Sequence, residues 1–115
     1  MAIPSGSGTE VLKVKIEDNA TNETVILITG VANHIYTILS IIMHNNASST
    51  KNHVLKVEDD NNGTDSEFLN QNIDAYKTFV WNDKFVLSGT DQLKLTVPSG
   101  ADSNIVCSYI DQDWS

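Results

Sequence analysis

The sequence predicts an all-β fold, an antiparallel β-sandwich of jelly-roll type with about eight strands in a single domain. Apolar and polar residues alternate in several short runs, most clearly in Leu93, Leu95 and Val97, which is typical of a strand with one dry face. Turn-forming residues such as Asn82-Asp83-Lys84 and Pro98-Ser99-Gly100 separate the apolar runs of residues 78–110. We therefore expect neighbouring runs in this stretch to pair as antiparallel hairpins.

Length and charge restrict the class of protein. A chain of 115 residues has the size of one domain, and we expect an N-terminal arm (1–8), a sandwich (9–111) and a tail (112–115). Its net charge of -8 opposes binding to nucleic acid. The start of the chain lacks the charged and apolar regions of a secretory signal, and the longest apolar run is too short to span a membrane. We expect a soluble protein made in the cytosol that binds neither nucleic acid nor membrane.

The N-terminal half predicts three strands after a small-residue arm. In residues 1–8 we expect a flexible arm whose Ala2, Ile3 and Pro4 become ordered against a neighbouring subunit. Residues 11–16 alternate and predict a half-buried strand, and the β-branched run 24–29 (TVILIT) predicts a strand covered on both faces.

The run of residues 35–43 (IYTILSIIM) is apolar on both sides, and its β-branched content favours a strand over a buried helix. We expect one side to enter the core. The other side carries Tyr36, Ile38 and Ile42, which we expect to meet another layer or another subunit.

Further strands are expected at residues 53–58, 67–69 and 73–80, with no helix longer than two turns. The residues expected to line the core are Leu12, Val14, Leu39, Ile41, Leu55, Val57, Leu93, Leu95 and Val97.

No catalytic, cofactor or metal site is expected, and we expect that the protein is not an enzyme. The three histidines, His34, His44 and His53, are the candidate zinc ligands. His34 and His44 flank one strand and would lie roughly 33 Å apart, so we expect three solvated histidines at strand ends rather than a zinc site. In the acidic loop Asp59–Asp65, Gly63 falls at position five of an EF-hand count instead of six, which favours a hairpin loop with Asx turns. An irregular calcium site in this loop remains the alternative.

The single cysteine and the two tryptophans have simple interpretations. Cys107 lies in an apolar run and is expected to be buried. Trp81 is expected in the core, whereas Trp114 lies in a polar C-terminal tail and is expected to pack on another chain.

Several segments resemble a known class of protein. The start MAIPSGSGTEVLK, the central IYTILSIIMHNNASS and the later WNDKFVLSGTDQLKLTV and SYIDQDWS resemble small virion structural proteins of tailed bacteriophages, especially marine and cyanobacterial ones. Gly89-Thr90-Asp91 stands where a direct Gly-Asp step is usual, which lengthens that turn.

The resemblance implies a β-sandwich in the virion, most of all a capsid decoration or cement protein, with a neck or tail accessory protein as the alternative. Implied partners are copies of the chain itself, in a homo-oligomer such as a trimer, and the major capsid protein or connector and tail proteins. A second class, a glycan- or receptor-binding module, would use the Asn-rich loops 45–52 and 59–65 with one exposed aromatic residue.

Overall fold

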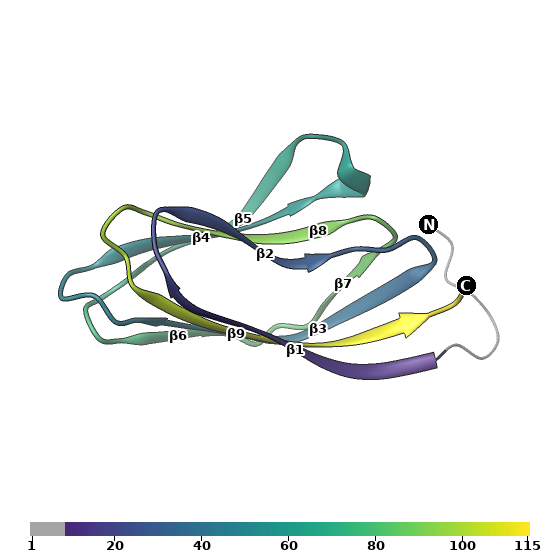
Figure 1. Ribbon diagram of the computed structural model, residues 1–115, viewed down its shortest axis with the longest axis horizontal. Helices are drawn as coiled ribbons and strands as arrows, with labels where there is room; N and C mark the ends of the chain where they lie inside the picture. Colours follow the sequence, from purple (N-terminus) through teal and green to yellow (C-terminus); the bar gives the residue numbers. More distant parts are fainter. Residues whose placement is uncertain (1–8) are drawn as a thin grey trace.

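The computed structural model describes residues 9–115, which form two packed antiparallel sheets (Figure 1). The first, five-stranded sheet has the order β1 (Thr9–Ala20), β9 (Ser103–Asp113), β3 (His34–Asn45), and then β6 (Thr78–Trp81) and β7 (Phe85–Ser88), which both pair with β3. The second, four-stranded sheet has the order β2 (Glu23–Thr29), β8 (Gln92–Val97), β4 (Lys51–Glu58) and β5 (Asp65–Ile73).

The predicted fold class is confirmed. Strands β1 to β4 alternate between the two sheets, and β7, β8 and β9 alternate again, which gives the jelly-roll arrangement. There are nine strands because the short β6 and β7 share one edge of the first sheet. The described residues contain a single helical segment, the three-residue 3₁₀ turn η1 (Asp59–Asn61). Within residues 9–115 there is no helix with the length and hydropathy needed to cross a bilayer.

The pairing expected for residues 78–110 is wrong. β6 and β7 both pair with β3 instead of with each other, and the turns after β7 and β8 carry the chain to the opposite sheet. Gly89 and Gly100 adopt positive φ (58° and 80°) in these turns, a conformation that glycine enters without steric cost. The strand expected at 73–80 is likewise interrupted, because residues 74–77 form a turn.

The residues predicted to line the core are mostly buried on the central strands but not on the edge strand β1. Ile41, Leu55, Leu93, Leu95 and Val97 are buried, and Val57 packs against them in part. Leu39 is only half-buried, and the expectation that Leu12 and Val14 line the core is wrong, because both are largely exposed. They lie on β1, an edge strand, on the side that points away from the second sheet.

A β-bulge explains which side chains of β3 are buried. Its register with β9 shifts between Ile38 and Ser40, so Leu39 is an extra residue and the alternation reverses there. Tyr36 and Ile38, before the shift, and Ile41, after it, therefore all enter the core. The expectation that Tyr36 and Ile38 meet another subunit is wrong, since their side chains are 3% and 0% exposed.

Two further expectations about strands need correction. β2 is not covered on both faces: a shift between Ile26 and Ile28 places Leu27 and Ile28 inside and leaves Ile26 exposed. β9 continues to Asp113, two residues beyond the expected end of the sandwich at residue 111.

Candidate interaction surface

The most distinctive surface of the described residues is the side of the five-stranded sheet that points away from the second sheet, hereafter the outer face (the underside of the lower layer in Figure 1). In an antiparallel sheet, directly paired residues point to the same side. The register therefore aligns Leu12 with Ile110, Val14 with Ser108 and Ile16 with Val106. It continues from Ile110 to Thr37 and Val86, and from Val106 to Ile42 and Val80.

Large apolar side chains on this face are exposed. Leu12, Val14, Ile16, Ile42, Val80 and Val86 are each between 37% and 71% exposed. Half-buried Ile110 and Val106 connect the β1 residues with those of β3, so the exposed groups form one continuous patch. Contiguous apolar patches of this extent on a folded domain mark interaction sites.

The centre of the outer face carries no ionised group. Between the β1 row and the β6–β7 row, the intervening positions are Val106, Ser108, Ile110, Thr37, Ser40 and Ile42. The chain as a whole has fifteen acidic and seven basic residues. The centre of the outer face is therefore free of this acidic surplus and is suited to burial against another apolar surface.

The structure separates the interface residues expected from the sequence. Ile42 lies on the outer face, whereas Tyr36 and Ile38 do not, and Ala2, Ile3 and Pro4 fall outside the described residues. The other outer-face residues were missed, because alternation identifies two sides of a strand without indicating which one another sheet covers.

Trp114 is partly buried. Its backbone N–H donates to the carbonyl of Asn33 at 2.9 Å. The indole Nε1 is shielded from solvent and finds no hydrogen-bond partner among the described residues. Its expected contact with another chain stays a prediction.

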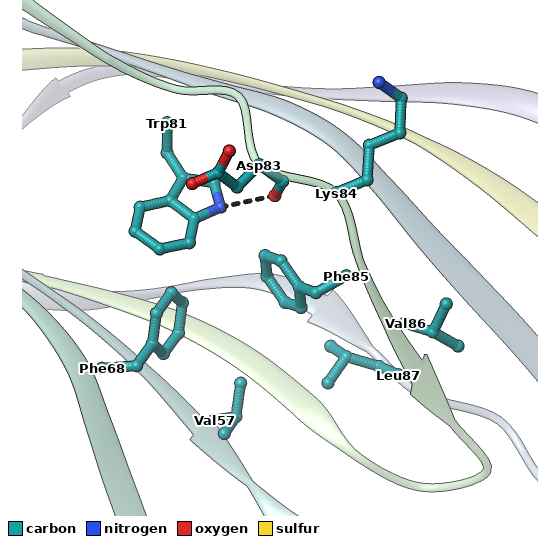
Figure 2. Close-up of a pocket in the computed structure, with 8 residues that line it drawn as sticks. All are labelled: Val57, Phe68, Trp81, Asp83, Lys84, Phe85, Val86 and Leu87. Atoms are coloured by element: carbon teal, nitrogen blue, oxygen red, sulfur yellow. Dashed lines mark hydrogen bonds between the residues drawn. The ribbon is translucent and has the colours of Figure 1, made fainter.

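A pocket of about 420 Å³ opens beside β5, β6 and β7 and is lined mostly by apolar side chains (Figure 2). Phe68, Trp81 and Phe85 meet edge to face, with ring centroids 5.4 to 6.3 Å apart. Trp81 and Phe85 pack against the core and remain partly exposed, so Trp81 is only in part the core residue that was expected.

The pocket offers little for polar recognition. The indole Nε1 of Trp81 already donates to the backbone carbonyl of Asp83 at 2.8 Å (Figure 2). The Lys84 side chain extends away from the converging rings, whereas the Asp83 carboxylate lies beside the Trp81 ring in this view (Figure 2). The aromatic and aliphatic lining suits an apolar group, with the Asp83 carboxylate as the acidic side chain beside it.

A charged cluster closes one end of the sandwich. The Asp111 carboxylate accepts hydrogen bonds from Nζ of Lys13 and Nδ1 of His34, each at 2.7 Å. Burial raises the pKa of Asp111, but the hydrogen bonds from Lys13 and His34 outweigh it and hold the pKa below the ordinary 3.8. The cluster joins β1, β3 and β9.

The expectation that the histidines are solvated is wrong for two of the three, His53 and His34. His53 is fully buried: its Nδ1 donates to the Lys51 carbonyl at 3.0 Å, so its Nε2 accepts from the Ser103 hydroxyl at 2.7 Å. Burial lowers the pKa of His53 below 6.5, which favours the neutral ring. His34 is mostly enclosed by its contact with Asp111.

The acidic loop forms the expected hairpin between β4 and β5, with an Asx turn from the Thr64 N–H to Oδ1 of Asn62. Among residues 9–115, one group of three possible metal ligands comes together, with carboxylate oxygens of Asp59, Asp60 and Asp91 within 4.8 Å of one another. The Asp91 carboxylate is used by the fold, since it accepts the backbone N–H groups of Asp60 and Ser88.

Comparisons with known proteins place the fold. No family model matches the chain, and no curated protein matches its sequence. Among solved structures it is similar to a protein of Bacillus endospore appendages, described as a novel family of disulfide-linked pili, with 14% identity and a TM-score of 0.60 over 100% of this chain and 97% of that one. It is also similar to a chain in the structure of infectious bursal disease virus, Gx strain, with 9% identity and a TM-score of 0.56 over 95% of this chain and 34% of that one. These likenesses show a shared β-sandwich fold.

Proposed function

We propose that this chain is a structural subunit of a virion, a bacteriophage capsid decoration or cement protein that acts through contacts between subunits. The observation that carries the proposal is the apolar outer face, whose centre has no ionised group and which no part of residues 9–115 covers. A subunit whose role is to bury surface against its neighbours needs such a face, whereas an exposed apolar face lowers the solubility of a monomeric protein.

The fold supports this role. A pilus protein and a viral protein share it, and in both cases the named object is an assembly of protein chains. The pili are described as disulfide-linked. In this chain the single cysteine, Cys107, is fully buried, and burial raises the pKa of its thiol to about 12. The proposed association of this chain therefore rests on non-covalent contacts.

The proposed partners are copies of the chain and the major capsid protein, with connector or tail proteins as the alternative, and the proposed location is the virion. The proposed role is not enzymatic. The buried polar groups described above support that view, because the hydrogen bonds of His53 and Asp111 join strands of the fold to one another.

Quantitative mass spectrometry of purified phage particles tests the proposal. A genome that carries this gene should yield particles containing many copies of the chain, in a fixed ratio to the major capsid protein. A neck or tail protein would give only a few copies per particle. Absence of the chain from washed particles would overturn the proposal.

One observation favours a glycan- or receptor-binding module as a second candidate. Tyr76 is 60% exposed and lies in the turn that contacts loop 45–52, where the Thr50 hydroxyl donates to Oδ1 of Asp74 at 3.0 Å. An exposed tyrosine beside an amide-rich loop provides a stacking surface and hydrogen-bonding groups. Binding on a glycan array that Tyr76→Ala abolishes would support this candidate.

A further inference from the structure

We infer that the outer face is covered by the outer face of a second copy, so that two copies close into a two-fold symmetric pair. The inference deepens the proposed function and rests on it, since it names the partner of the surface that carries that function. It follows from the size of the face, its charge and the state of the sheet edges.

The face has the size of a standard protein interface. β3 and β1 each contain 12 residues, a length of about 40 Å, and four strand positions span about 19 Å. The whole face, with apolar rows at its centre and Glu10 and Gln112 at one end, can therefore contribute roughly 750 Å² per copy. This is close to the roughly 800 Å² per partner that stable interfaces bury, and an apolar centre with a polar rim is their usual composition. Two aligned sheets packing face to face give the same type of contact as the interior of a β-sandwich.

Charge favours a second copy over a partner of opposite charge. With a net charge of -8, two copies repel each other unless they meet where neither has ionised groups. The centre of the outer face meets this condition, since Val14, Ser108 and Ile42 and their partners in the register are neutral. The Glu10 carboxylate lies at one end of the face, where it accepts a hydrogen bond from the Gln112 amide. A basic partner attracted by the acidic surplus would contact the other surfaces, where the carboxylates lie.

The edges of the sheet oppose sideways growth. On β1 the side chains of Lys13 and Lys15 point toward the interior side of the sheet, and inward-pointing charges at an edge prevent pairing with another strand. The opposite edge is divided between β6 and β7, with four residues each. A copy that contacts its partner only through the outer face, with both sheet edges free of contacts, forms a closed pair instead of a fibre.

The test measures the mass of the full chain in solution by size-exclusion chromatography with light scattering, and its dissociation constant by sedimentation. The parent should be a dimer. Val14→Lys and Ile42→Lys should each weaken the dimer by roughly a hundredfold, because each lysine is buried twice in a symmetric interface. Ile26→Lys is the matched control: Ile26 is 44% exposed on the other sheet, and its replacement should leave the dimer unchanged. Circular dichroism and melting of each variant check that the fold is intact.

Three results would overturn the inference: a monomeric parent at its highest soluble concentration, a trimer or open polymer, or a dimer that Ile26→Lys disrupts and the outer-face variants do not. Failure of the inference and failure of the proposed function are distinguishable. If the chain is abundant in particles but monomeric when purified, the proposed function stands, and the outer face contacts another virion protein instead of a second copy. If the chain is a dimer but is absent from particles, the two-fold pair stands and the proposed function is overturned.

Discussion

Nζ of Lys13 lies 2.7 Å from Oδ2 of Asp111, which is 98 positions away in the chain. The other oxygen of the same carboxylate accepts from His34, so one buried acid on β9 binds the edge strand β1 on one side and β3 on the other. Few side chains of β1 enter the core, and this ion pair compensates for that lack of apolar burial.

Replacement of this acid should destabilise the fold in a pH-dependent way. Asp111→Asn leaves Lys13 and His34 without their common acceptor and should lower the free energy of unfolding by about 1–3 kcal/mol. Because the folded pKa of Asp111 is depressed, its contribution is present above the unfolded value of 3.8 and is lost as the pH falls through the folded pKa. Urea denaturation should therefore show a difference between parent and variant near neutral pH that shrinks below the unfolded pKa. Asp113→Asn, at an exposed carboxylate, serves as control and should have a smaller effect.

His53 predicts a second pH dependence, at higher pH. Its folded pKa is lowered by burial, so protonation opposes folding. The stability that the neutral ring provides is complete above the unfolded value of 6.5 and declines as the pH falls from there toward the folded pKa. Melting temperatures measured across this range should fall toward acid pH in the parent. The decline should be flatter in His53→Gln, whereas His44→Gln, at a more accessible ring bonded to Thr78, should keep it. An equal slope in parent and His53→Gln would contradict the assignment.

Two leucines on central and edge strands should respond differently to truncation. Leu95 is fully buried, and Leu95→Ala should cost about 2–5 kcal/mol. Leu12 is 71% exposed, so Leu12→Ala should change the stability of the monomer by no more than about 0.5 kcal/mol. Denaturant titrations under conditions that keep the chain monomeric measure both values. A large loss from Leu12→Ala in the monomer would mean that β1 faces the other way.

The aromatic pocket should depend on the ring of Phe68. Phe68 contacts both Trp81 and Phe85 edge to face and connects β5 with the opposite sheet. Phe68→Ala should lower the free energy of unfolding by about 2–4 kcal/mol, near the lower end for a phenylalanine because the ring is partly exposed. It should also shift the tryptophan fluorescence of Trp81 toward longer wavelength. Phe68→Leu, which retains apolar volume, is the control and should retain most of the stability.

The sequence by itself determined the fold class and the centre of the core. The alternation of Leu93, Leu95 and Val97 specifies a strand and its buried side, because successive side chains of a pleated strand point to opposite faces. It also predicted Ile42 as an interface residue; Ile42 lies on the outer face, and its contact with another subunit stays a prediction.

Only the tertiary structure decided which strands pair and which side of each is covered. The turns around Gly89 and Gly100 have the composition of hairpin turns, yet they lead to the opposite sheet, because pairing depends on where the rest of the chain offers a free edge. Leu12 and Leu95 follow the same local pattern, but one lies on a face that no second sheet covers and the other lies between two sheets. Burial is a property of what lies opposite a side chain, and that neighbour is usually distant in the sequence, as Lys13 and Asp111 are.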